Sequence, residues 1–115
     1  MGLDPHGKEL PEDTPAAAQA FCVALIEATH QYCCCYKPNA AFFEQHGPAG
    51  VQALHEVVAA CQAKGVPVLL DAKRGDIGST SEAYAVAAYK VQSGPLEPLA
   101  PFACESGTAF QSRVR

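Results

Sequence analysis

Residues 66–76 read Val-Pro-Val-Leu-Leu-Asp-Ala-Lys-Arg-Gly-Asp, an apolar run that leads directly into charged residues. The apolar run predicts a buried strand over residues 66–71. Side chains alternate between the two faces of a strand, so Asp71 and Lys73 are expected to point the same way. Charges beside an apolar core are costly unless they are paired or take part in chemistry. An acid and an ammonium at this spacing, followed by Asp76, have the residue types that proton transfer needs.

Apolar runs and helical patterns alternate along the rest of the chain. Thr14 and Pro15 are typical of the start of a helix, and Gly65 is typical of the end of one. Ser79 and Glu82 have the spacing of a capping box at the start of the last helix. The expected strands cover residues 2–5, 32–37 and 66–71, and the expected helices cover 15–30, 39–45, 49–64 and 79–92. Apolar strands that alternate with helices predict the α/β class, with a parallel sheet covered by helices.

Charged residues lie where the expected strands end. Asp4, Lys37 and Asp71 hold these positions, and Lys73 follows closely after one of them. The carboxyl ends of parallel strands line one crevice in α/β folds, so these four side chains are expected to share one site. Their alternating signs allow several charges to share a dry pocket, because a nearby carboxylate favours the charged form of a lysine. A charged lysine held in place is a proton donor rather than a nucleophile.

The composition of the 115-residue chain argues against several classes of protein. A net charge of −4, a pI near 5.4 and the lack of a basic cluster argue against nucleic-acid polymers and anionic membranes as partners. The sequence shows neither an apolar run of membrane-spanning length nor the layout of a signal peptide. The six cysteines lack zinc-ligand spacing. We interpret them as reduced core residues, which together with the missing signals predicts a cytoplasmic location.

Three segments resemble one known family and occur in that family's order. They are Gly-Leu-Asp-Pro at 2–5, Tyr-Lys-Pro-Asn-Ala-Ala-Phe-Phe-Glu at 36–44 and Leu-Asp-Ala-Lys-Arg-Gly-Asp-Ile-Gly-Ser-Thr at 70–80. The resemblance is to orotidine 5′-phosphate decarboxylases of the bacterial type. It implies a (β/α)₈ TIM barrel whose carbon–carbon lyase reaction releases CO₂ from orotidine 5′-phosphate to form UMP in pyrimidine biosynthesis. It implies no metal and no organic cofactor.

The resemblance also implies catalytic roles for individual residues. The family's alternating array of lysines and aspartates would consist here of Lys37, Asp71, Lys73 and Asp76. Asp71 would face the substrate carboxylate and disfavour it as charge builds. Lys73 would stabilise the developing carbanion at C6 and protonate it.

Substrate binding and assembly are implied in the same way. Asp4 and Lys37 would hold the ribose hydroxyls of the nucleotide substrate. Asp76 and Thr80 would reach into the site of the neighbouring subunit, with Thr80 among the substrate-binding residues. The implied enzyme is therefore a homodimer with shared active sites.

The resemblance covers residues 1–92, which we expect to form the N-terminal portion of the barrel, about its first three strand–helix units. A barrel of this kind has about 250 residues, so we expect the 115-residue chain to be a fragment that is inactive alone. Residues 93–115 are expected to form a divergent, irregular tail. Within it, residues 96–102 faintly resemble a family segment normally found after the fourth strand, whereas the ending Phe-Gln-Ser-Arg-Val-Arg matches nothing in the family. Two alternatives remain open: a Mg²⁺-dependent sugar-phosphate decarboxylase or aldolase of the same superfamily, and a catalytically dead interaction fragment.

Overall fold

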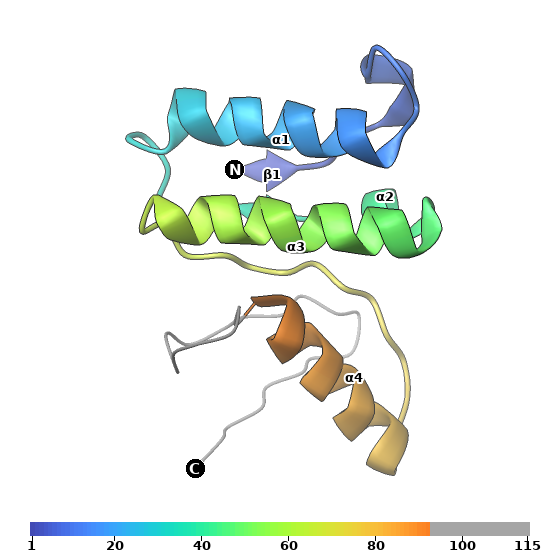
Figure 1. Ribbon diagram of the computed structural model, residues 1–115. Helices are drawn as coiled ribbons and strands as arrows, with labels where there is room; N and C mark the ends of the chain where they lie inside the picture. The colour runs from blue at the N-terminus through green and yellow to red at the C-terminus, as the bar shows by residue number, and fades with distance from the viewer. Residues whose placement is uncertain (93–115) are drawn as a thin grey trace.

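A computed structural model of the chain describes residues 1–92, so the predicted tail at 93–115 lies outside the described residues. Helices and short strands alternate along these residues (Figure 1). In chain order they are β1 (Gly2–Leu3), the 3₁₀ turn η1 (Gly7–Glu9), α1 (Pro15–Thr29), β2 (Lys37–Pro38), α2 (Ala41–Glu44), α3 (Gly47–Ala63) and α4 (Gly78–Gln92). The predicted α/β class is confirmed.

The strands are parallel, and β2 lies in the middle. β1 pairs with β2 in the register Gly2 to Lys37. On its other side β2 faces the extended segment 66–71, through parallel bridges from Tyr36 to Val68 and from Asn39 to Asp71. Both bridges have the same register, so segment 66–71 acts as a third parallel strand. This order places the ends of all three side by side.

Regular strand structure is shorter than the sequence predicted. The expected strand at 32–37 is wrong over residues 32–35, which form a turn between α1 and β2. The segment expected as a strand at 66–71 bridges to the β2 region at Val68 and Asp71, and Leu69 N–H donates to Tyr36 O between them. Pro38 explains why the ladder is interrupted there, because it has no N–H to donate to the neighbouring segment.

The helix ends follow local chemistry. Thr14 Oγ1 accepts a hydrogen bond from Ala17 N at 3.2 Å, and Pro15 occupies the first helical position, as predicted. After α3, Gly65 adopts φ +69° and its N–H donates to Gln62 O, while Val66 N–H donates to Cys61 O. This pair of bonds is a Schellman motif and confirms the predicted stop. The capping box at Ser79 is wrong, since α4 already begins at Gly78.

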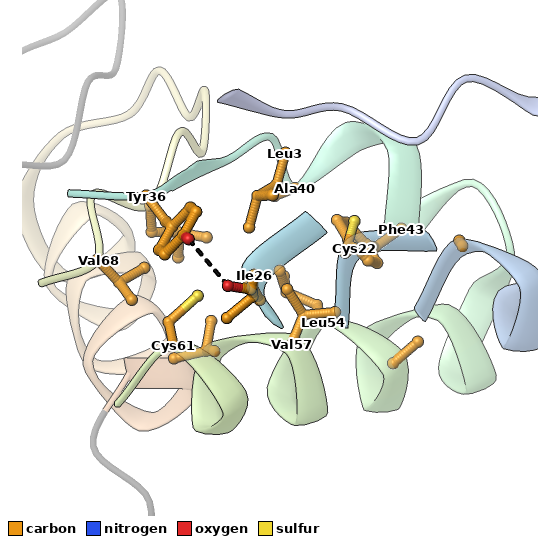
Figure 2. Packing of buried hydrophobic residues seen from close by; sticks show 14 of the residues in the cluster. Leu3, Cys22, Ile26, Tyr36, Ala40, Phe43, Leu54, Val57, Cys61 and Val68 are labelled. Carbon is orange, nitrogen blue, oxygen red and sulfur yellow. Dashed lines mark hydrogen bonds between the residues drawn. The ribbon is translucent and has the colours of Figure 1, made fainter. Parts of the chain in front are cut away.

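The core lies between the sheet and two helices that run side by side, α1 and α3 (Figure 1). Leu3, Ile26, Tyr36 and Phe43 are fully buried there. Figure 2 shows the Tyr36 ring inside this cluster, with its hydroxyl donating to Ile26 O at 3.3 Å. That phenol also shares a 2.8 Å hydrogen bond with Thr29 Oγ1, so β2 is tied to the end of α1.

The five cysteines of the described residues divide into two groups, and Cys104 lies outside these residues. Cys22 and Cys61 belong to the core, and burial raises the pKa of each thiol to about 12. These two were predicted correctly. Cys34 is exposed, and Cys33 and Cys35 are only half-buried, so the prediction of core positions is wrong for this run. The turn at 32–35 leaves Cys34 exposed and Cys35 half-buried, whereas Cys33 still packs against the edge of the core.

Among the described residues, no helix combines the length and the apolar character that crossing a membrane requires.

Candidate active site

One face of the sheet is covered by helices, and the other carries charge. Tyr36, Pro38 and Ala40 alternate along β2 and beyond it, and all three are buried on the helix side. Lys37 and Asn39 must therefore point to the opposite face. In the register of the sheet, Asn39 is level with Asp71. The alternation that buries one set of side chains thus collects the polar set on the other face.

Two lysines converge on one aspartate at this face. Lys37 Nζ lies 2.7 Å from Asp71 Oδ2, and Lys73 Nζ lies 2.6 Å from Asp71 Oδ1. Lys37 comes from β2, whereas Asp71 and Lys73 follow one another on the third strand and its exit. The predicted convergence of these three groups is confirmed. We call Lys37, Asp71 and Lys73 the charged triad.

The triad holds Asp71 in its ionised form. Hydrogen bonds from Lys37 and Lys73 lower the pKa of the Asp71 carboxyl, although burial acts in the opposite direction. The Asp71 side chain is only 5% exposed, so its two oxygens meet ammonium groups rather than water. A buried carboxylate is tolerated in this way because both of its charge-assisted contacts are satisfied.

The two lysines of the triad differ in how much of each side chain is exposed to solvent. The Lys73 side chain is 67% exposed and that of Lys37 is 34% exposed, so solvent reaches part of each side chain. A ligand at this face would meet a fixed anion flanked by two cations. An acidic group on that ligand, if placed against Asp71, would be repelled, whereas negative charge developing beside Lys73 would be stabilised.

The other predicted site residues lie after β1, after the third strand and in α4. Asp4 follows β1, is half-buried, and turns its carboxylate to the same face as Gly2, where a Cβ on Gly2 would come within 2.6 Å of Asp4 Oδ2. Asp76 is exposed, and its Oδ1 accepts a hydrogen bond from Ile77 N. Thr80 is exposed in the first turn of α4. In the described part of the chain, the ion pairs of Asp71 are those with the two lysines.

Sequence reasoning missed two features of this region. Asn39 lies two residues after Lys37 on the same face, and its Oδ1 accepts from Ala41 N at 3.2 Å. The alternation of side chains in a strand was the signal that would have found it. The second feature is the partner of Arg74: the sequence indicated an exposed charge or an ion-pair residue there, and the structure pairs it with Glu44, 30 residues away. A local sequence pattern cannot predict an ion pair between residues so far apart in the chain.

Across residues 1–92, no group of three or more His, Cys, Asp or Glu side chains is arranged to hold a metal ion. Both oxygens of Asp71 already accept from lysine ammonium groups. The absence of a cofactor stays a prediction.

The parallel sheet, its helices and the charged residues at its strand ends form an α/β arrangement of the kind found in (β/α)₈ barrels. Residues 1–94 match the family model of the orotidine 5′-phosphate decarboxylase / HUMPS family. The chain belongs to this family.

Individual relatives agree with the family match. The chain is 46% identical over 105 residues to an orotidine 5′-phosphate decarboxylase of Roseiflexus sp. (strain RS-1), covering 89% of this chain and 38% of the relative. It is 53% identical over 87 residues to one from Natronomonas pharaonis, covering 74% and 32%. A crystal structure of an orotidine-monophosphate decarboxylase from Toxoplasma gondii superposes with a TM-score of 0.75 at 52% identity, covering 80% of this chain and 32% of that one. The chain therefore spans about a third of the length of these relatives.

Proposed function

We propose that this chain carries the charged part of an orotidine 5′-phosphate decarboxylase active site, which converts orotidine 5′-phosphate to UMP in pyrimidine biosynthesis. The observation that carries the proposal is the charged triad: Asp71 is held ionised with Lys37 on one oxygen and Lys73 on the other. Family membership and the relatives' names support the same reaction.

The proposed chemistry uses the two kinds of charge in turn. The substrate carboxylate lies against Asp71, and their repulsion disfavours the bound ground state. The bond between C6 and the carboxyl carbon breaks, CO₂ leaves, and the electron pair stays on C6. Lys73 stabilises this carbanion and gives it a proton, which leaves a neutral amine that water reprotonates.

The remaining residues are proposed to bind and to assemble. Asp4 and Lys37 hold the ribose hydroxyls from the open face. Asp76 completes the array of alternating charges from a neighbouring subunit, and Thr80 contacts the substrate there. Both side chains are exposed, as a role across a subunit boundary requires. The assembly proposed is a homodimer that acts in the cytoplasm without a metal or an organic cofactor.

A hybrid barrel tests this function. Residues 1–92 of this chain replace the corresponding segment of the Roseiflexus relative, and UMP formation from orotidine 5′-phosphate is measured. We expect the hybrid to form UMP and Lys73→Met to reduce kcat at least about a thousandfold, because the proton donor is lost. The matched control is Lys64→Met, which removes a lysine from an ion pair with Glu27 away from the triad. A folded hybrid without activity, or one indifferent to Lys73→Met, would contradict the proposal.

The magnesium-dependent alternative requires a separate experiment, because the description of the matched family also names the HUMPS group. A Mg²⁺ ion would have to displace a lysine ammonium from Asp71, since both carboxylate oxygens are engaged. We therefore expect EDTA to leave UMP formation by the hybrid unchanged. Loss of activity in EDTA that added Mg²⁺ restores would favour the alternative.

A further inference from the structure

Arg74 joins three parts of the molecule next to the charged triad. Its guanidinium forms an ion pair with Glu44, the last residue of α2. Another of its nitrogens donates to the main-chain carbonyl of Lys73 at 2.9 Å. Its Cζ lies 5.6 Å from the centre of the Tyr84 ring on α4, within the range of a cation–π contact. One side chain thus contacts α2, the exit of the third strand and α4.

Arg74 lies in the segment that joins the third strand to α4. Residues 72–77 have no regular secondary structure. Lys73 is mostly exposed, and its ammonium is held at Asp71 Oδ1 alone among the described hydrogen bonds. A long, exposed lysine loses considerable side-chain entropy when it is fixed by one contact. The placement of its ammonium therefore depends on how firmly its main chain is held.

The ion pair between Arg74 and Glu44 links the same two segments of the chain as the triad does. Glu44 lies seven positions after Lys37, on the helix that follows β2, and Arg74 directly follows Lys73. The pair from Arg74 to Glu44 therefore links the same two strand exits that Lys37 and Asp71 link. The planar guanidinium has five donors in a fixed fork, so it can hold a carboxylate and a carbonyl at once, which a lysine at this position could not do.

We propose that Arg74, anchored by Glu44, is a positioning residue that fixes the main chain of Lys73 and so holds its ammonium against Asp71. Its importance for catalysis rests on the proposed function, but the positioning itself does not. The alternative is an ordinary surface ion pair that contributes little and has no effect on the triad.

The first experiment measures the pKa of the Asp71 carboxyl by carbon-13 NMR in the full 115-residue chain. Among the described residues, the charged groups that face this carboxyl are Lys37 from β2 and Lys73 from the exit of the third strand. Positioning predicts that Glu44→Gln raises this pKa, because Lys73 loosens. Simple electrostatics predicts a fall, because a nearby negative charge is removed. The sign of the shift decides between them, and a fall or no change would overturn the proposal.

Two further variants and a control sharpen this test. Arg74→Lys keeps the positive charge but loses the fork, so positioning predicts a rise in the Asp71 pKa and pure charge predicts none. In a Lys73→Met background the effect of Glu44→Gln should disappear, since Arg74 acts through Lys73. An effect of equal size in that background would overturn the proposal. Glu27→Gln breaks the exposed pair with Lys64 and should leave the Asp71 pKa unchanged.

Kinetics in the hybrid barrel test the catalytic consequence. We expect Glu44→Gln and Arg74→Lys each to lower kcat about tenfold with little change in KM, because a misplaced proton donor slows the chemical step. If the NMR shifts appear while kcat is unaffected, the catalytic importance of the positioning is overturned. If the parent hybrid itself forms no UMP, the proposed function fails, while the NMR result still decides whether Arg74 positions Lys73.

Discussion

Asp71 is the residue on which the site depends. Its neighbours could be read from the sequence in part: Lys73 shares its face by strand alternation, and Lys37 lies at the end of an adjacent strand. What the sequence could not supply is that both lysines contact the same carboxylate, one on each oxygen. That outcome depends on the sheet register, which sets Asn39 opposite Asp71 and so brings Lys37 within reach.

The Asp71 carboxylate makes folding dependent on pH in a defined direction. Its pKa is lowered in the folded chain by Lys37 and Lys73, so the unfolded chain binds the proton more readily. The contribution to stability is therefore present above the ordinary aspartate pKa of about 3.9 and is lost as the pH falls through the lower folded value.

We expect Asp71→Asn to destabilise the chain by about 2 kcal/mol at neutral pH, because two lysines lose their shared anion. The difference between the two proteins should shrink as the pH drops below about 4. Chemical denaturation at a series of pH values measures it, with Glu27→Gln as the exposed-pair control. A difference that is independent of pH would show that Asp71 is not ionised by its lysines.

At the scale of elements, the helices were easier to predict than the strands. Thr14, Pro15 and Gly65 are local signals, and the structure places each in the expected role. The strands depend on partners distant in sequence, and only short stretches of β1 and β2 pair regularly. The sequence also gave no indication that α3 would pack its first turn directly onto α2.

This packing of α3 leads to a prediction at Gly50. A Cβ at this position would lie 1.8 Å from the main-chain oxygen of Phe43, so no side chain fits. Helix propensity alone would make Gly50→Ala favourable by about 1 kcal/mol. We expect the opposite sign, with a loss of about 2 kcal/mol or more in stability.

The neighbouring position provides the control for Gly50. Ala49 is exposed in the same turn of α3, so Ala49→Gly should cost only the propensity term of about 1 kcal/mol. Thermal or urea unfolding of both variants measures the comparison. If Gly50→Ala stabilises the chain, the close contact between α2 and α3 is wrong.

At the scale of the whole molecule, the described residues form an open sheet. In the described part, segment 66–71 pairs with β2 on one side, and no further strand pairs on the other. Among residues 1–92, the helices that pack on the sheet, α1 and α3, lie on the face opposite the triad. The family relatives continue well beyond the region this chain matches, since the matched part is 38% of the Roseiflexus protein. Contacts to distant parts of a substrate normally contribute to rate, and this region holds only part of the barrel.

We therefore expect the 115-residue chain alone to form no measurable UMP, whereas the hybrid barrel does. A radiometric assay of CO₂ release from carboxyl-labelled orotidine 5′-phosphate compares the two at equal concentrations. Release by the isolated chain at the rate of the hybrid would contradict this expectation. Binding of the isolated chain to a full-length decarboxylase subunit, together with inactivity of the hybrid, would favour the interaction-fragment alternative.

The most direct test of the central claim is the pKa of the Asp71 carboxyl in the native chain. Titration by carbon-13 NMR should give a value below the ordinary aspartate pKa of about 3.9. Lys37→Met and Lys73→Met should each raise it, because each lysine contacts a different oxygen. An ordinary or elevated value in the native chain, or one that neither lysine variant changes, would show that these three side chains do not form a single charged cluster.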